Sequence, residues 1–447
     1  MRLLVSAVML ITSVSACAAP ATTPMARTEV PPTQTANPTP IEPPATTAAP
    51  AGTAAPVMTV VSGKGGDIKA ARTVLTPAFV DGVNAFGFKL LQEVAASEVN
   101  KNVFISPASV SLALAMVYNG AKGRTAENMA AALGLGARSL NEANTAYTAL
   151  QTLLRDADPK VTLSIANSLW ARQGLALDTD FVQRTQTFYQ AQMNELDFNN
   201  PDAAKTINQW VSDNTRGKIN QIVDPPIDRD MVLFLINAIY FKGSWQRPFD
   251  AKITRPMPFK PESGPSADTP MMFQMGKYAY FATPQFQAVR LPYGDGVFSM
   301  VVILPAAGVT LEQLRPSLTG ENWRNWSTQF KATDGDIALP KFKLEYKKEL
   351  TSALGKLGMS SAFGGGADFT GMRAEPPGLA ISEVQHKTFV EVNEEGTEAA
   401  AVTSAGMRTT SLRETKRFSM VVDHPFFFAI QDDQTSTVLF SGLISKP

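Results

Sequence analysis

The sequence predicts one large α+β domain in which helices come first and strands dominate the C-terminal half. Three observations lead to this prediction. Apolar residues recur at helical spacing over residues 77–98. The segment 231–241 is apolar throughout, which is typical of a strand buried on both faces. Further candidate strands then follow one another toward the C-terminus, over 297–304, 337–344, 388–392, 418–422 and 438–444.

Composition excludes several classes of function. The chain has 447 residues and a hydrophobic fraction of 44%, as a globular protein with a sizeable core would have. It carries 40 basic and 40 acidic residues, so no global field favours nucleic acid or an anionic membrane. Two histidines and one cysteine leave little for a zinc site, which usually needs three or four such ligands, and one cysteine cannot form an internal disulfide. We therefore expect no metal, no cofactor and no nucleic-acid partner.

The N-terminus predicts export. Arg2 is followed by an apolar run over 3–11 and by small residues up to Ala16, a secretory pattern too short to remain as a spanning helix. The residues before Cys17 resemble the lipobox of bacterial lipoproteins, so residues 1–16 are predicted to be the signal peptide and Cys17 the site of lipid attachment. Ala18 after the cysteine points to the outer membrane in that sorting pattern. The alternative is cleavage after Ala18 or Ala19, which would give a secreted soluble product.

Residues 17–70 are predicted to be a disordered spacer, and residues 71–447 the folded domain. The spacer is rich in proline, threonine and alanine and has no periodicity, so it cannot bury a core. Within the domain, Ser106 is a plausible helix cap with Pro107 in the first turn. Pro201 is predicted to open a helix with Ile207, Trp210 and Val211 on one face. Residues 161–165 alternate as a strand does.

Several motifs in the folded domain resemble the serpin family. Two lie near the C-terminus, where residues 392–401 resemble the hinge of the serpin reactive loop and 421–430 resemble the family's C-terminal signature. Others lie upstream in the same order as in the family, over 102–107 with Ser109, 236–245, 291–293 and 339–342. The similarity runs from about residue 75 to the end of the chain.

The resemblance implies a serpin fold of three β-sheets, about eight to nine helices and an exposed reactive loop. It also implies an inhibitor and not an enzyme. A serine protease would cleave the loop and form its acyl-enzyme, and the loop would then insert into the main sheet, trapping the protease covalently. We expect a monomer whose only membrane contact is the N-terminal lipid.

The hinge sequence is compatible with insertion as a strand, because alternate residues of a strand face opposite ways. One alternation is uncharged and mostly small, while both charges fall in the other. The hinge implied by the resemblance comprises Glu394, Gly396, Thr397, Glu398, Ala399, Ala400, Ala401 and Thr403. The uncharged face could enter a core without burying an unpaired charge.

The family's spacing from the hinge places the cleaved bond between Thr410 and Ser411. Counting back from the C-terminal signature places it one residue later. Arg408 and Arg413 are competing bait residues that would attract trypsin-like proteases, whereas Thr410 would suit a protease with a small pocket, such as an elastase or subtilisin. Thr410 is the preferred prediction.

Two further groups are assigned from the resemblance. The first is a shutter in the main sheet, made of Ser106, Ser109, Asn237 and His386. The second is a breach at the top of the sheet, made of Trp245, Lys341 and Glu394, with a salt bridge between the last two. His386 could instead be a general base, but no serine nucleophile motif accompanies it. The alternative functions are a non-inhibitory surface binding module and an inhibitor of cysteine proteases.

Overall fold

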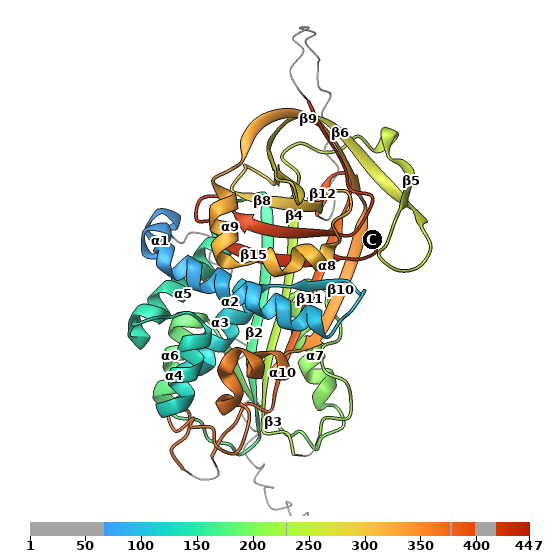
Figure 1. The fold of residues 1–447 in the computed structure, drawn as a ribbon. Coiled ribbons are helices and arrows are strands. Elements are labelled where there is room, and N and C mark those ends of the chain that lie inside the picture. The colour runs from blue at the N-terminus through green and yellow to red at the C-terminus, as the bar shows by residue number, and fades with distance from the viewer. Residues whose placement is uncertain (1–66, 229, 376–377, 398–416) are drawn as a thin grey trace, which may run out of the picture. The chain divides into compact units, whose positions relative to one another are not determined.

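The computed structural model describes residues 67–447 except 229, 376–377 and 398–416. Two hydrogen-bonded β-sheets organise this part of the chain (Figure 1). The six-stranded sheet has the order β10 (Phe342–Glu349), β11 (Glu383–Val392), β12 (Gly396–Thr397), β4 (Leu233–Ser244), β2 (Val161–Arg172) and β3 (Gln192–Leu196).

The second sheet has nine strands. Its order is β1 (Val103–Ile105), β15 (Val438–Ile444), β14 (Phe426–Asp432), β8 (Phe298–Pro305), β7 (Phe286–Pro292), β6 (Ala267–Ala282), β9 (Lys331–Pro340) and β13 (Phe418–Val421), with β5 (Arg255–Phe259) paired to β6. Three sheets were expected. The hydrogen bonds join the strands into two because the long strand β6 pairs with β7 at one end and with β9 and β5 along the rest.

Ten α-helices lie in the described part of the chain, and the shortest, α8 and α10, have four residues each. They are α1 (Ile68–Val74), α2 (Pro77–Ala96), α3 (Pro107–Tyr118), α4 (Gly123–Ala132), α5 (Leu140–Asp156), α6 (Thr179–Tyr189), α7 (Ala203–Asn214), α8 (Leu311–Leu314), α9 (Gly320–Ser327) and α10 (Thr351–Leu354). The fold is therefore α+β, as predicted.

Local sequence signals account for the ends of several helices. Thr76 caps α2 by accepting from the backbone N–H of Phe79, with Pro77 in the first turn. Ser106 caps α3 in the same way, as its sequence predicted. Helix α7 begins at Ala203, two residues after the predicted start at Pro201. Helix α1 begins at Ile68, so the folded part starts before the predicted boundary at residue 71.

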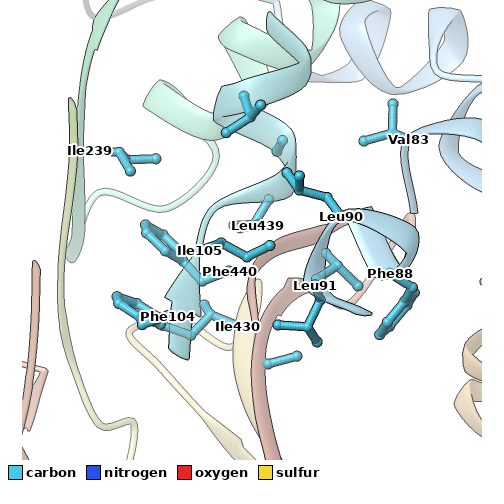
Figure 2. Close-up of a cluster of buried hydrophobic side chains, with 14 of the residues drawn as sticks. Val83, Phe88, Leu90, Leu91, Phe104, Ile105, Ile239, Ile430, Leu439 and Phe440 are labelled. Carbon is cyan, nitrogen blue, oxygen red and sulfur yellow. The ribbon is translucent and has the colours of Figure 1, made fainter. Parts of the chain in front are cut away.

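The largest hydrophobic core is formed by one face of the six-stranded sheet together with strands of the nine-stranded sheet and helices such as α2 and α3. In Figure 2 its side chains converge from α2, β1, β4, β14 and β15: Val83, Phe88, Leu90, Leu91, Phe104, Ile105, Ile239, Ile430, Leu439 and Phe440. The ring of Phe104 stacks on that of Phe440, with centroids 5.3 Å apart. This packing fixes the inner face of the sheet against the nine-stranded sheet and α2.

Strand β4 is buried on both faces, as its apolar run predicted. Leu235 and Ile239 face the large core, while Ile236 and Tyr240 belong to a second cluster that includes Ile207 of α7. Alternate residues of the strand thus contact different partners. The sheet is covered on both sides where β4 runs.

One predicted strand is wrong in its extent. Residues 337–344 were expected to form a single strand, but β9 ends at Pro340 and β10 begins at Phe342. Pro340 pairs with Met271 in the nine-stranded sheet, whereas Phe342 pairs with Val392 in the six-stranded sheet. The chain therefore passes from one sheet to the other at Lys341.

Within the described residues, no single helix is both long and apolar enough to cross a membrane. Helices α1 and α2 meet that criterion only as a pair, and they are bent by 79° relative to each other.

Candidate functional site at the boundary between β11 and β4

Strands β11 and β4 are parallel neighbours, and we call the boundary between them the seam. They pair directly from Glu383 opposite Phe234 to Phe389 opposite Tyr240. Beyond that point β12 lies between them, and Thr397 pairs with Val392 of β11 on one side and with Gly243 of β4 on the other. The seam is therefore closed at one end and already occupied by two hinge residues at the other.

A tight turn returns the chain from β11 into the seam. The side chain of Asn393 accepts from the backbone N–H groups of Glu395 and Gly396, at 3.0 and 3.3 Å. Gly396 has a φ of 149°, and a Cβ added there would lie 2.2 Å from the carbonyl oxygen of Gly243. Only glycine fits, because both the backbone conformation and the space exclude a side chain.

Thr397 is the last described residue of the hinge, and its side chain is buried against the large core. Its hydroxyl forms a 2.8 Å hydrogen bond with the hydroxyl of Tyr293. The Tyr293 ring stacks on Trp245 with centroids 4.4 Å apart, and the Trp245 indole donates to the carbonyl of Asn393 at 2.9 Å. Burial raises the pKa of Tyr293 far above its usual value, so its hydroxyl stays protonated.

Glu394 ties the turn to neighbouring elements. Its carboxylate lies 2.7 Å from the ammonium of Lys341 and accepts from the Thr254 hydroxyl at 2.8 Å, while its carbonyl accepts from the backbone N–H of Phe249. Partial burial on its own would raise the pKa of Glu394. The hydrogen bonds from Lys341 and Thr254 outweigh it, so the pKa lies below the usual value.

The closed end of the seam holds a buried polar network around His386 of β11 and Asn237 of β4, which are directly opposite in the parallel ladder. The Nε2 atom of His386 accepts from the backbone N–H of Ser106 at 3.1 Å. The ring proton is therefore on Nδ1, which donates to the side-chain oxygen of Asn237 at 2.5 Å. Burial lowers the pKa of His386 to about 3, so the ring is neutral.

Asn237 extends this network to α3 and β2. Its amide group donates to the carbonyl and the hydroxyl of Ser109 and to the side-chain oxygen of Asn167. The hydroxyl of Ser106 donates to the carbonyl of Leu439 and not to His386. His386 is thus held as a structural hydrogen-bonding residue and does not face a nucleophile.

The structure brings the shutter residues together at the closed end, and Trp245, Lys341, Glu394, Gly396 and Thr397 at the open end. Sequence reasoning did not assign a role to Asn167, Tyr293 or Thr254. Asn167 lies directly opposite Asn237 in the β2–β4 ladder, but that register depends on tertiary pairing. Tyr293 lies within the serpin-like segment 291–293, yet nothing in the neighbouring sequence connects it to the hinge.

The remaining predicted residues lie outside the described part of the chain. They are Cys17 and the hinge and bait residues Glu398, Ala399, Ala400, Ala401, Thr403, Arg408, Thr410, Ser411 and Arg413. Among residues 67–397 and 417–447, apart from the short gaps, no group of three or more His, Cys, Asp or Glu side chains could hold a metal ion.

Comparisons with known proteins agree with this geometry. Residues 81–447 match the family model described as Serpin (serine protease inhibitor). The chain is 39% identical to human Serpin B9 over 81% of its own length and 97% of that protein. It is 38% identical to the leukocyte elastase inhibitor of Xenopus laevis, with the same coverage. The crystal structure of the thermophilic serpin tengpin in its native state aligns with a TM-score of 0.77, at 31% identity, over 83% of this chain and 94% of that one.

The fold and the seam define the class of protein, an α+β scaffold in which a short hinge strand lies between two strands of the main sheet. The chain belongs to the serpin family. The resemblance to the serpin family is confirmed, and the protein is a protease inhibitor and not an enzyme.

Proposed function

We propose that the protein is a single-use inhibitor of serine endopeptidases, which traps its target by inserting the cleaved reactive loop into the seam. The observation that supports this most is the position of β12 between the two strands of the seam. Its two residues already lie between β11 and β4: Thr397 pairs with both strands, and Gly396 pairs with Ser244 of β4. A loop continuing from Thr397 has a starting point with defined register on each side.

Extending that register predicts how the rest of the loop would fit. Each residue further along the loop would pair with one residue earlier in both β4 and β11, because the inserted strand is antiparallel to each. Thr403 comes six residues after Thr397 and would therefore lie between Asn237 and His386. Ala399, Ala401 and Thr403 would face the same side as Thr397, toward the large core.

This arrangement gives the closed end of the seam a defined role. Insertion would place one strand between β11 and β4 and move them apart by about 4.8 Å more than their present spacing. The hydrogen bond between His386 and Asn237 cannot survive that separation. The hydroxyl of Thr403, which can donate and accept, would take its place, so the polar groups would not be left buried without partners.

The chemical step belongs to the protease. Its serine hydroxyl would attack the carbonyl carbon of the residue before the cleaved bond, preferably Thr410 with Arg408 or Arg413 as alternatives. The peptide bond would break, the amine of the next residue would leave with a proton from the protease histidine, and an ester would join the two proteins. Insertion before water attacks that ester would keep the protease bound.

We would test this by mixing the purified protein with trypsin, an elastase and subtilisin in parallel. The expected result is a band of the summed mass that survives denaturing electrophoresis. Mass spectrometry of the released C-terminal peptide would give the cleaved bond. Cleavage without a complex, and without a gain in thermal stability, would overturn the proposal and indicate a non-inhibitory binding module. The same assay with papain tests inhibition of cysteine proteases.

A hinge variant tests the insertion step. Thr397→Arg would bury a guanidinium at a fully buried position, which costs several kcal/mol. We expect this variant to be cleaved at the same bond without trapping the protease. Thr397→Ser, which keeps the hydroxyl, is the matched control. Normal trapping by Thr397→Arg would contradict insertion at this position.

We also propose that the protein is exported and anchored to the cell envelope, in the outer membrane, by acyl chains on Cys17. The support is the charged start, short apolar run and lipobox-like residues of the sequence. Labelling of cells with a radioactive fatty acid should mark the wild-type protein and not Cys17→Ser. Equal labelling of both, or of neither, would contradict the anchor.

A further inference from the structure

We propose that Tyr293 is a positioning residue for loop insertion, which holds Thr397 in register between β11 and β4 through the buried hydrogen bond between their hydroxyl groups. This inference rests on the proposed inhibitory function, because it assigns Tyr293 a role in starting insertion. The partner that Tyr293 recognises is the hinge of its own chain.

Tyr293 is held rigidly enough to act as a fixed reference. Its backbone N–H donates to the carbonyl of Phe298 at 2.8 Å, and it forms an isolated β-bridge with Trp245. Its ring stacks on that of Trp245 and makes a T-shaped contact with the ring of Phe241, with centroids 5.1 Å apart. The ring is fully buried, so packing fixes where its hydroxyl oxygen lies.

The hydroxyl pair adds a buried side-chain hydrogen bond to the backbone pairing that holds β12. That strand has only two residues, Gly396 and Thr397, and Gly396 has no side chain to pack. Among the side-chain hydrogen bonds in the described part of the chain, the one to Thr397 is the only one that the Tyr293 hydroxyl makes. If the hinge left the seam, water could reach both hydroxyls. A hydroxyl that lost its partner would therefore be left unsatisfied only while the hinge is inserted.

The energetics of a buried pair give a distinctive signature. Removing one hydroxyl leaves the other buried without a partner, whereas replacing both by apolar groups of the same shape is nearly neutral. Tyr293→Phe and Thr397→Val should each shift the hinge toward the expelled state by roughly 5- to 150-fold. The double variant should recover most of that loss. A side chain that merely fills space would not show this rescue.

The first measurement is hydrogen exchange on the intact, uncleaved protein, read by mass spectrometry from peptides that cover residues 393–397. Exchange of the hinge amides follows the population of the expelled hinge. We expect faster exchange in Tyr293→Phe and in Thr397→Val, wild-type exchange in Thr397→Ser, and near wild-type exchange in the double variant. Unchanged exchange in both single variants would overturn the inference, as would a double variant that exchanges as fast as the single ones.

The second measurement is the number of inhibitor molecules consumed for each protease molecule trapped. A hinge that starts outside the seam inserts later, so the single variants should be cleaved without trapping several times more often than the wild type. The double variant should return toward the wild-type ratio. If the wild-type protein traps no protease, the proposed function fails while the exchange result still stands, so the two failures are distinguishable.

Discussion

His386 should make the folded protein sensitive to mild acid. In the folded state its pKa is about 3, against about 6.5 for an unperturbed histidine. Below pH 6.5 the unfolded chain binds a proton at this ring and the folded chain does not, so stability falls as the pH drops until the folded pKa is reached. The loss is about 1.4 kcal/mol per pH unit.

Between about pH 7.5 and pH 5 this linkage removes roughly 2 kcal/mol from the free energy of unfolding. For a domain of this size that corresponds to about 2–3 °C in the midpoint of thermal unfolding. The variant His386→Gln cannot be protonated and can still hydrogen-bond on both sides. We expect it to be less stable than the wild type near pH 7.5, because the fit to Ser106 and Asn237 is poorer.

The assay is calorimetry at one fixed scan rate, because unfolding of a large domain is often irreversible. The midpoint of thermal unfolding should fall between pH 7.5 and pH 5 in both proteins, and this fall should be about 2–3 °C smaller in His386→Gln than in the wild type. His424→Gln is the matched control, since His424 is the other histidine of the chain and lies partly exposed near the surface. Equal falls in wild type and His386→Gln would refute a neutral buried His386.

Two further predictions concern the open end of the seam. Gly396→Ala places a Cβ 2.2 Å from the Gly243 carbonyl oxygen, so it should expel the hinge and convert trapping into simple cleavage; a normal yield of trapped protease would contradict it. Glu394→Gln should lower the unfolding midpoint by about 1 °C near pH 7, and added salt should reduce the difference because Lys341 is partly exposed. Since the pKa of Glu394 is lowered in the folded state, this difference should disappear as the pH falls below about 4.5. The control is Lys101→Met, which removes the more exposed ion pair between Lys101 and Glu98 and should lower the unfolding midpoint by less. A Glu394→Gln effect that grew in acid would rule this explanation out.

Local patterns were sufficient to predict the elements whose ends are set by nearby residues. Ser106 and Pro107 predicted the start of α3, and the apolar run after Met231 predicted the doubly buried strand β4. The alternation of the hinge predicted a small, uncharged inner face, and Thr397 is indeed buried toward the core. These features follow from helix capping and from the twofold period of a strand.

Features that depend on which strands meet could not be predicted. Between Ile337 and Leu344, Pro340 is a local mark of a break, because it cannot donate to a ladder. It does not reveal that the chain changes sheet at Lys341, since that change is decided by pairing of the flanking residues with Met271 and Val392. The same holds for Asn167, whose role depends on its register opposite Asn237. Such choices are made by long-range contacts, which leave little trace in the local sequence.

In the proposed mechanism, the two ends of the seam would impose an order on insertion. At the open end β11 and β4 are already separated by Gly396 and Thr397, while at the closed end they are joined by the ladder and by the bond between His386 and Asn237. Insertion would therefore run from Thr397 toward the shutter and would break the β11–β4 ladder one residue at a time. The hydrogen bond of His386 would be broken only when the sixth residue after Thr397 arrived. Because Thr403 is that residue and carries a hydroxyl, the step that opened the shutter would also supply a new partner for its buried polar groups.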